Sequence, residues 1–534
     1  MQNLDDYSPK QLRKAIEKCG SIRELSRQTG IPRSTIQDRL YREQKMDFQT
    51  KQATRPLVVS KPRKGLVKRY IFSSAQNNTP VHRGFLTNLE AYATYLNAEI
   101  IIGTYTYNKT LFAGTPEEMT FHPAIKKYIS NERIEIGDKI VFCGEMNISP
   151  TAVNPLSGFE TYTRSKWGIF PHPRVSMESI ATMFTEPAKI IMSTGTCTRP
   201  NYIQQKAGIK AEFHHVIGAV LVEIDGDGDI FARHLIAGPP YGSFRDLDHY
   251  VFNGYVSAGH PVEAITWGDV HLEQMDDDVA RGSWGIDSDL EWAVGNEHCM
   301  LDVLRPKYQF FHDSLDFQAR NHHNINDPYH RFEMYWNDKN RVHDALEKVA
   351  NFLEITQRDG CRSLVVESNH DKMLLRWLAE ADYKNDPANA IFFLQSQLRR
   401  YLAIAERQTD YNLFEDILRS DMGAELGAVT FLQETSSFPI CNGIECALHG
   451  HKGSGGAKPS MKTFARMGPK ANIAHTHAAG ILEGIYRAGT SSKLDMGYNK
   501  GGLSNWNHSH IVTYPNGKRA IITMQGSKWR AENT

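Results

Sequence analysis

Five short hydrophobic segments in the second half of the chain are each followed by residues that bind metals or transfer protons. The segments span residues 263–267, 308–311, 363–367, 446–448 and 471–474. The residues that follow them are Asp269 and His271; Asp313; Asn369, His370 and Asp371; His449; His475 and His477. Each segment has the length and hydrophobicity of a buried strand. Because the carboxyl ends of parallel strands meet at one edge of a sheet, we expect these side chains to lie together.

The side-chain types in this set indicate a metal site. Carboxylates, an amide and imidazoles without a thiolate suit divalent ions such as Mn²⁺, Fe²⁺ or Zn²⁺ better than Mg²⁺. A single D-x-H or H-x-H pair is common by chance. The prediction therefore depends on all five motifs and their order along the chain.

That order resembles the calcineurin-like metallophosphoesterase superfamily with an SbcD-like nuclease core, whose motifs are GDxH, GD, GNHD or GNHE, H and GHxH. The resemblance covers about residues 262–526, within a domain expected over 262–534. It implies two divalent ions, foremost Mn²⁺ with Fe, Zn or Mg as alternatives. It assigns one ion to Asp269, His271 and His477, the other to Asn369, His449 and His475, and the bridging position to Asp313. A hydroxide bridging the ions would hydrolyse the phosphoester. His370 would stabilise the transition state or protonate the leaving group, and Asp371 would orient His370.

The sequence departs from the superfamily pattern at three glycines. His312, Ser368 and Ala474 stand where relatives have glycine before a ligand. If those glycines serve a positive φ, each replacement costs about 1 kcal/mol or more. Two alternatives also stay open: Asp316 as the bridging residue, and His451 as the ligand in place of His449.

The first 50 residues predict three short helices. Ser8-Pro9 begins the first and Gly20 ends it, Ser21 to Glu24 is a capping box, and a turn at 29–32 precedes a third helix over 33–42. The pattern resembles a helix-turn-helix, whose third helix contacts the major groove of DNA. Its outward residues, and so the expected DNA contacts, are Arg33, Ser34, Thr35, Gln37 and Arg39. The alternative is a three-helix bundle that docks onto protein.

Charge supports the DNA interpretation. Residues 1–70 hold 17 Lys and Arg but 7 Asp and Glu, although the whole chain has 61 of each. An excess of positive charge at one end favours a polyanionic partner. We interpret 51–67 as a basic linker.

Residues 68–261 alternate between strand and helix patterns, which predicts a middle α/β domain with a mostly parallel sheet and no assigned role. Strands are expected at 70–72, 99–103, 139–143, 189–192, 216–224 and 230–235, and a helix at 84–97. The sequence DGDGD at 225–229 has alternating aspartates but no glutamate at the position that a calcium loop requires. We expect a hairpin turn there.

The overall prediction is an α/β chain: an N-terminal helix-turn-helix, a middle α/β domain, and a C-terminal metallophosphoesterase β-sandwich flanked by helices. Within the last, a helical insertion at about 372–440 has an apolar face that would cap the site or form a homo-oligomer contact. Seven cysteines without a C-x-x-C pair indicate free thiols. The lack of a long apolar run or a signal peptide predicts a cytoplasmic protein without a membrane partner, in the host cytoplasm if phage-encoded.

This organisation also resembles the pre-early host-DNA-degradation proteins of lytic coliphages. We therefore expect a metal-dependent DNA nuclease that hydrolyses phosphodiester bonds. A phosphatase or nucleotide phosphodiesterase is one alternative, and a non-catalytic DNA-binding regulator is another.

Overall fold

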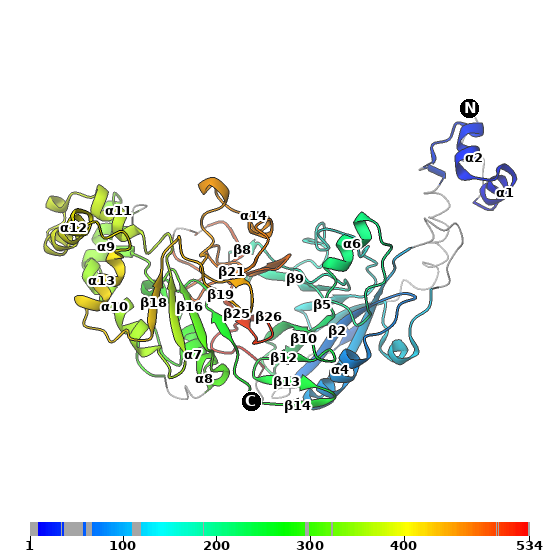
Figure 1. Ribbon diagram of the computed structural model, residues 1–534, viewed down its shortest axis with the longest axis horizontal. Coiled ribbons are helices and arrows are strands. Elements are labelled where there is room, and N and C mark those ends of the chain that lie inside the picture. Colours follow the sequence, from blue (N-terminus) through cyan, green and yellow to red (C-terminus); the bar gives the residue numbers. More distant parts are fainter. Residues whose placement is uncertain are drawn as a thin grey trace. The chain divides into compact units, whose positions relative to one another are not determined.

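The computed structural model describes residues 9–33, 35–36, 57–59, 67–108, 119–184, 186–293, 298–321, 324–497, 499 and 501–531. The chain divides into two compact units, Met1–Leu57 and Val58–Thr534 (Figure 1). A short strand, β1 (Leu57–Val59), spans the boundary in the sequence. The fold is mixed α/β, as expected.

The N-terminal unit contains α1 (Pro9–Cys19) and α2 (Ile22–Thr29), both of which the sequence predicts. Ser21 caps α2 by accepting a hydrogen bond from the Glu24 amide at 3.1 Å. Gly30 ends α2 with φ 72°, a conformation that glycine adopts without strain. The buried side chains that hold the unit together are Leu12, Leu25, Ile31 and Ile36. Most of the predicted third helix lies outside the described residues.

A four-stranded sheet in the larger unit has the order β11 (Ile230–Ile236), β10 (Gly218–Ile224), β2 (Lys68–Gln76) and β3 (Ala98–Tyr105), and α4 (Arg83–Leu96) packs beside it. Only β2 and β3 are parallel. The prediction of a mostly parallel sheet is wrong here because residues 225–229 close a β10–β11 hairpin. That turn is confirmed, and the Lys528 ammonium contacts its three aspartates.

A second, longer sheet, which we call the long sheet, combines strands from both halves of the larger unit. In order it contains β4 (Arg133–Ile136), β5 (Ile140–Cys143), β6 (Trp167–Phe170), β9 (Lys189–Ser193), β7 (Met177–Ile180), β22 (Gly480–Leu482), β23 (Ile485–Arg487), β21 (Lys470–Ile473), β20 (Ile444–Glu445) and β19 (Pro439–Ile440). The antiparallel pairing of β7 with β22 joins the two halves. The sheet is therefore continuous across the boundary predicted at residues 261 and 262.

A six-stranded sheet faces part of the long sheet. Its order is β18 (Val429–Leu432), β17 (Arg362–Val366), β16 (Tyr308–His312), β15 (Ala264–Thr266), β25 (Ser509–Thr513) and β26 (Arg519–Thr523). Strands β15 to β18 are parallel to one another. Phe310 and Leu364 from this sheet pack against Ile440 and Ile444 from the long sheet in one buried cluster. The two sheets thus form a sandwich over that region.

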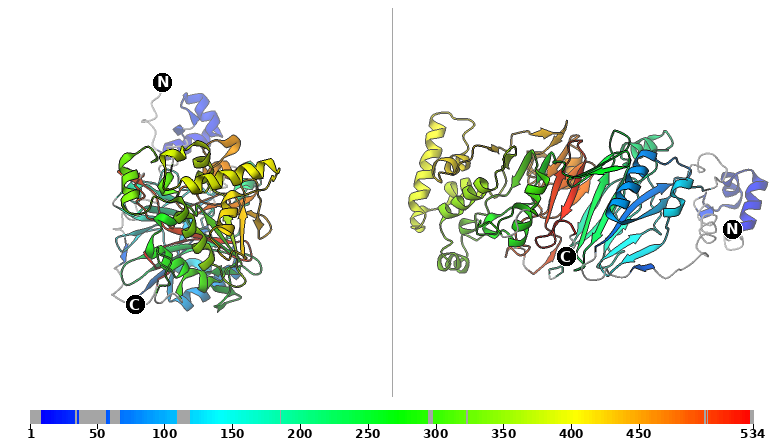
Figure 2. Two further views of the ribbon diagram at one scale, coloured as in Figure 1. Left: turned by 90° about the vertical axis from the view of Figure 1, so that its left-hand side faces the viewer. Right: turned by 90° about the horizontal axis from the view of Figure 1, so that it is seen from below.

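Helices cover the opposite face of the six-stranded sheet (Figures 1 and 2). They are α7 (Asp277–Trp284), α8 (Met300–Leu304), α10 (Val342–Ile355), α11 (Met373–Glu380) and α13 (Leu413–Ser420), with α9 (Pro328–Trp336) and α12 (Ala390–Ala405) further out. The apolar face predicted for α12 is exposed at Ile391, Leu394, Leu398 and Leu402. None of the helices in the described ranges has both the length and the hydrophobicity needed to cross a bilayer.

The smaller elements complete the larger unit. β12 (Phe244–Asp246), β13 (His249–Phe252) and β14 (Tyr255–Ser257) form a three-stranded sheet, β8 (Thr182–Met183) pairs with β24 (Leu503–Ser504), and the remaining helices include α6 (Lys206–Phe213) and α14 (Met461–Ala465). One predicted strand is wrong: β20 ends at Glu445, so residues 446–448 approach His449 as irregular chain.

Candidate metal centre

The predicted ligands converge because two sets of parallel strands end at the same place. Asp269 and His271 follow β15, Asp313 follows β16, and Asn369 follows β17 in the six-stranded sheet. In the facing long sheet, β20 and β21 are parallel and precede His449, His475 and His477. The carboxyl ends of both sheets therefore contribute side chains to one edge of the sandwich.

Four of these residues form a buried group. Ligand atoms of Asp269, His271, Asp313 and His477 all lie within 4.8 Å of one another. The His271 Nε2 atom is 2.9 Å from His477 Nε2 and 3.5 Å from Asp313 Oδ2. The His477 Nε2 atom is 3.4 Å from Asp269 Oδ2. This spacing suits several donors that share one cation.

A second group shares Asp313 with the first. Asp313, His449 and His475 also have ligand atoms within 4.8 Å of one another. The His449 Nε2 atom lies 3.3 Å from Asp313 Oδ2 and 3.0 Å from Asn369 Oδ1. All seven predicted ligands are thus brought together, and Asp313 is common to both groups, as the bridging assignment requires.

The chemistry of this cluster fits a bound cation. Asp269 is buried, yet neither of its carboxylate oxygens has a hydrogen-bond partner among the described residues. Burial and the neighbouring Asp313 carboxylate raise the pKa of Asp269 to about 8. Burial lowers the pKa of His271 to about 3, so this imidazole is in the neutral, metal-binding form. Ionising a buried carboxylate that accepts no hydrogen bond is costly, and a divalent ion would lower that cost.

Backbone strain lies at the ligands themselves. φ is positive at His271 (43°), Asp313 (46°), His475 (77°) and His477 (57°). Non-glycine residues in this region cluster at functional sites, where the surrounding structure holds them.

The residues before the ligands behave differently. The positive-φ residues do not include His312, Ser368 or Ala474. The backbone strain that replacing glycine could cause at these three positions is therefore absent. Gly268 is retained for another reason, since a Cβ there would lie 2.8 Å from the Thr490 backbone.

Asp316 orients two imidazoles. Its Oδ1 atom is 3.0 Å from His271 Nδ1 and 3.4 Å from His370 Nδ1, and its carbonyl is 3.1 Å from His370 Nδ1. Asp316 therefore contacts the nitrogen of His271 that points away from His477 and Asp313, which places it behind the ligands rather than between the two groups. A carboxylate in this position fixes the tautomer of a metal-binding histidine.

His370 has an electrostatic environment that favours its charged form. Burial lowers its pKa, but the carboxylates of Asp313 and Asp316 outweigh that effect, so the pKa is raised above its ordinary value. Its backbone amide also approaches Asp313 Oδ1 at 3.4 Å. The two carboxylates therefore favour the protonated form of His370 beside the two groups of predicted ligands.

Asp371 does not have the orienting role that the resemblance implies. Its carboxylate accepts hydrogen bonds from Ser368 Oγ at 2.8 Å and from the Leu315 amide at 3.2 Å. Instead, Asp316 on the loop after β16 contacts His370. Asp371 connects that loop to the end of β17 through its hydrogen bonds with Leu315 and Ser368.

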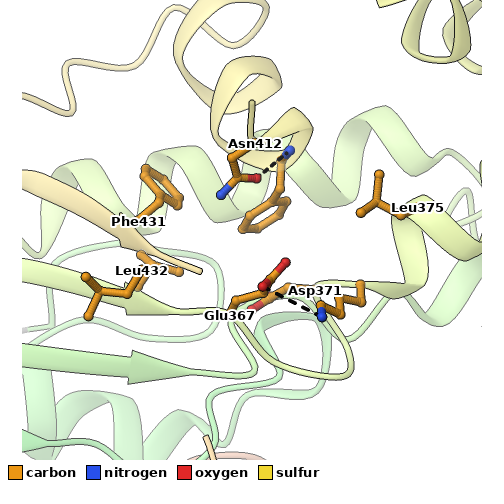
Figure 3. A pocket seen from close by; sticks show the side chains of 9 residues that line it. Glu367, Asp371, Leu375, Asn412, Phe431 and Leu432 are labelled. Carbon is orange, nitrogen blue, oxygen red and sulfur yellow. Dashed lines mark hydrogen bonds and ion pairs between the residues drawn. The ribbon is translucent and has the colours of Figure 1, made fainter. Parts of the chain in front are cut away.

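A small pocket lies behind this loop (Figure 3). Asp371 lines it together with Glu367, Leu375, Asn412, Phe431 and Leu432. Its volume of about 20 Å³ holds a water molecule but not a phosphate ester.

His451 lies beside the cluster rather than in it. Its Nε2 atom is 2.7 Å from Glu434 Oε1, and Lys452 contacts the other oxygen of the same carboxylate. His449, not His451, has ligand atoms next to Asp313 and Asn369. The geometry therefore favours His449 over His451 as the predicted ligand.

Two further residues support the site, and no sequence motif marks either of them. The Glu273 carboxylate accepts hydrogen bonds from the amides of Asp316, Phe317 and Gln318 at 2.7–3.0 Å, which fixes the loop that presents Asp316. The Trp506 ring lies 4.1 Å, centroid to centroid, from the His477 ring. Neither residue belongs to a motif, so spacing along the chain does not reveal them.

The predicted DNA-binding face is described only in part. Arg33 and Thr35 are exposed and Ile36 is buried, as expected for the start of the third helix. Ser34, Gln37 and Arg39 lie outside the described residues, and DNA contact stays a prediction.

Comparisons with known proteins connect the chain to a phage. No family model and no solved structure matches it. Protein A1 of Escherichia phage T5 is 40% identical over 474 residues, which cover 87% of this chain and 83% of that protein. This agrees with the phage resemblance. The chain belongs to the same protein family as phage T5 Protein A1.

Proposed function

We propose that this protein is a metal-dependent nuclease that hydrolyses phosphodiester bonds in DNA. The observation that carries the proposal is the convergence of seven oxygen- and nitrogen-bearing side chains in two groups that share Asp313. One of them, Asp269, is a buried carboxylate without a hydrogen-bond partner among the described residues. The donor set suits Mn²⁺ best, with Fe²⁺, Zn²⁺ and Mg²⁺ as alternatives.

Two cations would be held by the two groups. Asp269, His271 and His477 would hold one, Asn369, His449 and His475 the other, and Asp313 would contact both. Divalent ions held in pairs polarise phosphoryl oxygens and supply a nucleophile from water at neutral pH.

The residues around the ligands prepare them for this chemistry. Asp316 accepts a hydrogen bond from Nδ1 of His271, which leaves the lone pair of Nε2 for a cation. The carboxylates of Asp313 and Asp316 raise the pKa of His370, which favours the protonated form of its ring. With Nδ1 directed at Asp316, His370 can donate from Nε2 to a leaving oxygen.

DNA is the proposed substrate because of the N-terminal unit. Its helix pattern and the basic residues of 1–70 support binding to a polyanionic duplex. A phosphatase of small molecules would have no evident use for such a unit.

The test is cleavage of closed circular and end-labelled linear DNA with Mn²⁺, Mg²⁺ and Zn²⁺ in turn. We expect cleavage by the wild type, and its loss in Asp313→Ala and His370→Ala. Asp359→Ala, which removes an exposed aspartate, serves as the matched control and is expected to cleave normally. Hydrolysis of phosphomonoesters or nucleotides without DNA cleavage would establish a phosphatase or phosphodiesterase instead. DNA binding with neither bound metal nor hydrolysis would establish a regulator.

A further inference from the structure

The guanidinium of Arg487 lies close to the candidate metal centre but outside it. Arg487 ends β23, which runs parallel to β21, the strand before His475 and His477. Its Nε atom donates a hydrogen bond to the carbonyl of Ala478, the residue after His477, at 2.6 Å. Arg487 is therefore at the same edge of the long sheet as the ligands.

The rest of this guanidinium has no protein partner in the described parts of the chain. Arg487 is half-buried, yet its Nη1 and Nη2 atoms donate no hydrogen bond to a described residue, and no described carboxylate forms an ion pair with it. Arg519, on a neighbouring strand, shows the usual pattern: its Nη1 and Nη2 atoms donate to Ala471, Asn472 and Gly484. The Nη groups of Arg487 are not paired within the described residues, and the side chain is only half-buried, so they are available to bind an anionic ligand.

The charge and shape of the Arg487 guanidinium indicate which kind of ligand it binds. Burial lowers the pKa of Arg487 to about 10, which leaves it positively charged at neutral pH. The planar fork of Nη donors matches two oxygens of a phosphate.

The sheet register shows where such a phosphate would lie. Arg487 pairs with Ile473, and paired residues point to the same face of a sheet. Ile473 packs with Phe464 of α14, whereas the adjacent Asn472 points to the six-stranded sheet and bonds Thr266. Arg487 is thus on the α14 face of the long sheet, beside the metal cluster rather than inside it. The Glu178 and Asp269 carboxylates favour the charge of Arg487, but neither forms an ion pair with its guanidinium.

From this placement we propose that Arg487 binds a backbone phosphate adjacent to the scissile phosphate of a polynucleotide. The inference rests on the proposed function and deepens it, because it makes Arg487 a residue that favours polynucleotides over substrates with a single phosphate.

The test uses a single-stranded hexanucleotide, which offers no major groove to the N-terminal unit, and the full-length protein. Removing one charge-assisted phosphate contact is expected to raise KM about 10- to 100-fold in Arg487→Gln, with kcat changed much less. The slope of log affinity against log salt should fall by about 0.7. Arg487→Lys keeps the charge but not the fork, so we expect an intermediate KM and an unchanged slope. Lys462→Gln, which removes an exposed charge on α14, is the control and should change KM less than 2-fold.

Chemically modified substrates show which phosphate Arg487 contacts. Hexanucleotides carrying one neutral methylphosphonate, on either side of the scissile bond, are compared with the unmodified strand. The wild type should lose affinity for one of the two, and Arg487→Gln should be insensitive to that same replacement.

The inference is wrong if Arg487→Gln binds like the wild type, or if it weakens binding of all three strands while remaining sensitive to both methylphosphonates. Failure of the proposed function is a separate result: the wild type would cleave neither circular nor linear DNA in Mn²⁺. In that case, binding of the same strands measured by fluorescence anisotropy in EDTA still tests Arg487, with the same expected pattern.

Discussion

Replacing Asp269 with asparagine should stabilise the metal-free protein and reduce its stabilisation by metal. Asp269 is buried, and its pKa rises from 3.8 to about 8 because burial and Asp313 oppose its negative charge. The folded state therefore binds this proton more tightly than the unfolded state. The contribution of this carboxyl group to metal-free stability should be greatest below about pH 4 and should fall as the pH rises towards 8.

The size of the effect follows from the pKa change. At ~1.4 kcal/mol per pKa unit, the raised pKa costs at most ~6 kcal/mol at pH 8. An asparagine amide buried in the same place costs ~1–3 kcal/mol of its own. Asp269→Asn should thus raise the free energy of unfolding of the metal-free larger unit by ~3 kcal/mol at pH 8. At pH 4.5 the difference should be within ~1 kcal/mol.

The assay is urea unfolding of EDTA-treated wild type and variant at the two pH values, repeated with Mn²⁺. At a Mn²⁺ concentration 100 times its dissociation constant, the wild type should gain ~2.7 kcal/mol and the variant much less. If Asp269→Asn is less stable than the wild type at pH 8 without metal, the reasoning from an uncompensated buried charge is refuted.

Three further predictions concern the surroundings of the site. Asp316→Asn should weaken Mn²⁺ binding by about 10- to 100-fold, because His271 loses the carboxylate that orients it; unchanged affinity by calorimetry would contradict this. Gly268→Ala should lower the free energy of unfolding by ~1–3 kcal/mol, since its Cβ would press on the Thr490 backbone; an unaltered urea midpoint would show that the backbone shifts freely. Lys528→Met should cost ~1–2 kcal/mol by leaving Asp225 without its ammonium partner, and an equally stable variant would mean that water replaces it.

The sequence predicts the residues of the site better than it predicts the order of the strands in the sheets. Strand-end motifs are sufficient to bring six of the seven predicted ligands together, because parallel strands deliver their carboxyl ends to one edge, whatever the order of the other strands. The exception is His449, which follows irregular chain after β20. The same reasoning cannot reveal that β7 pairs with β22, because residues 177–180 and 480–482 share no local pattern that marks them as partners. Long-range pairing of this kind depends on the assembled core.

The orienting residues show a similar limit. Asp371 follows His370 directly, so the sequence favours it as the partner of that imidazole, but the chain turns after β17 and points Asp371 at Ser368 and Leu315. Asp316, which is 54 residues away, reaches His370 because β16 and β17 are adjacent and parallel. Arg487 is a single basic residue after a short strand, and only its open guanidinium distinguishes it from other surface charges.

The central claim is that two groups of side chains sharing Asp313 hold divalent cations. Anomalous diffraction from crystals of the full-length protein grown with Mn²⁺ tests it most directly. We expect two peaks, one bounded by Asp269, His271 and His477 and one by Asn369, His449 and His475, with Asp313 reaching both. Mn²⁺ peaks only elsewhere on the molecule, with none beside Asp269 or Asp313, would contradict it.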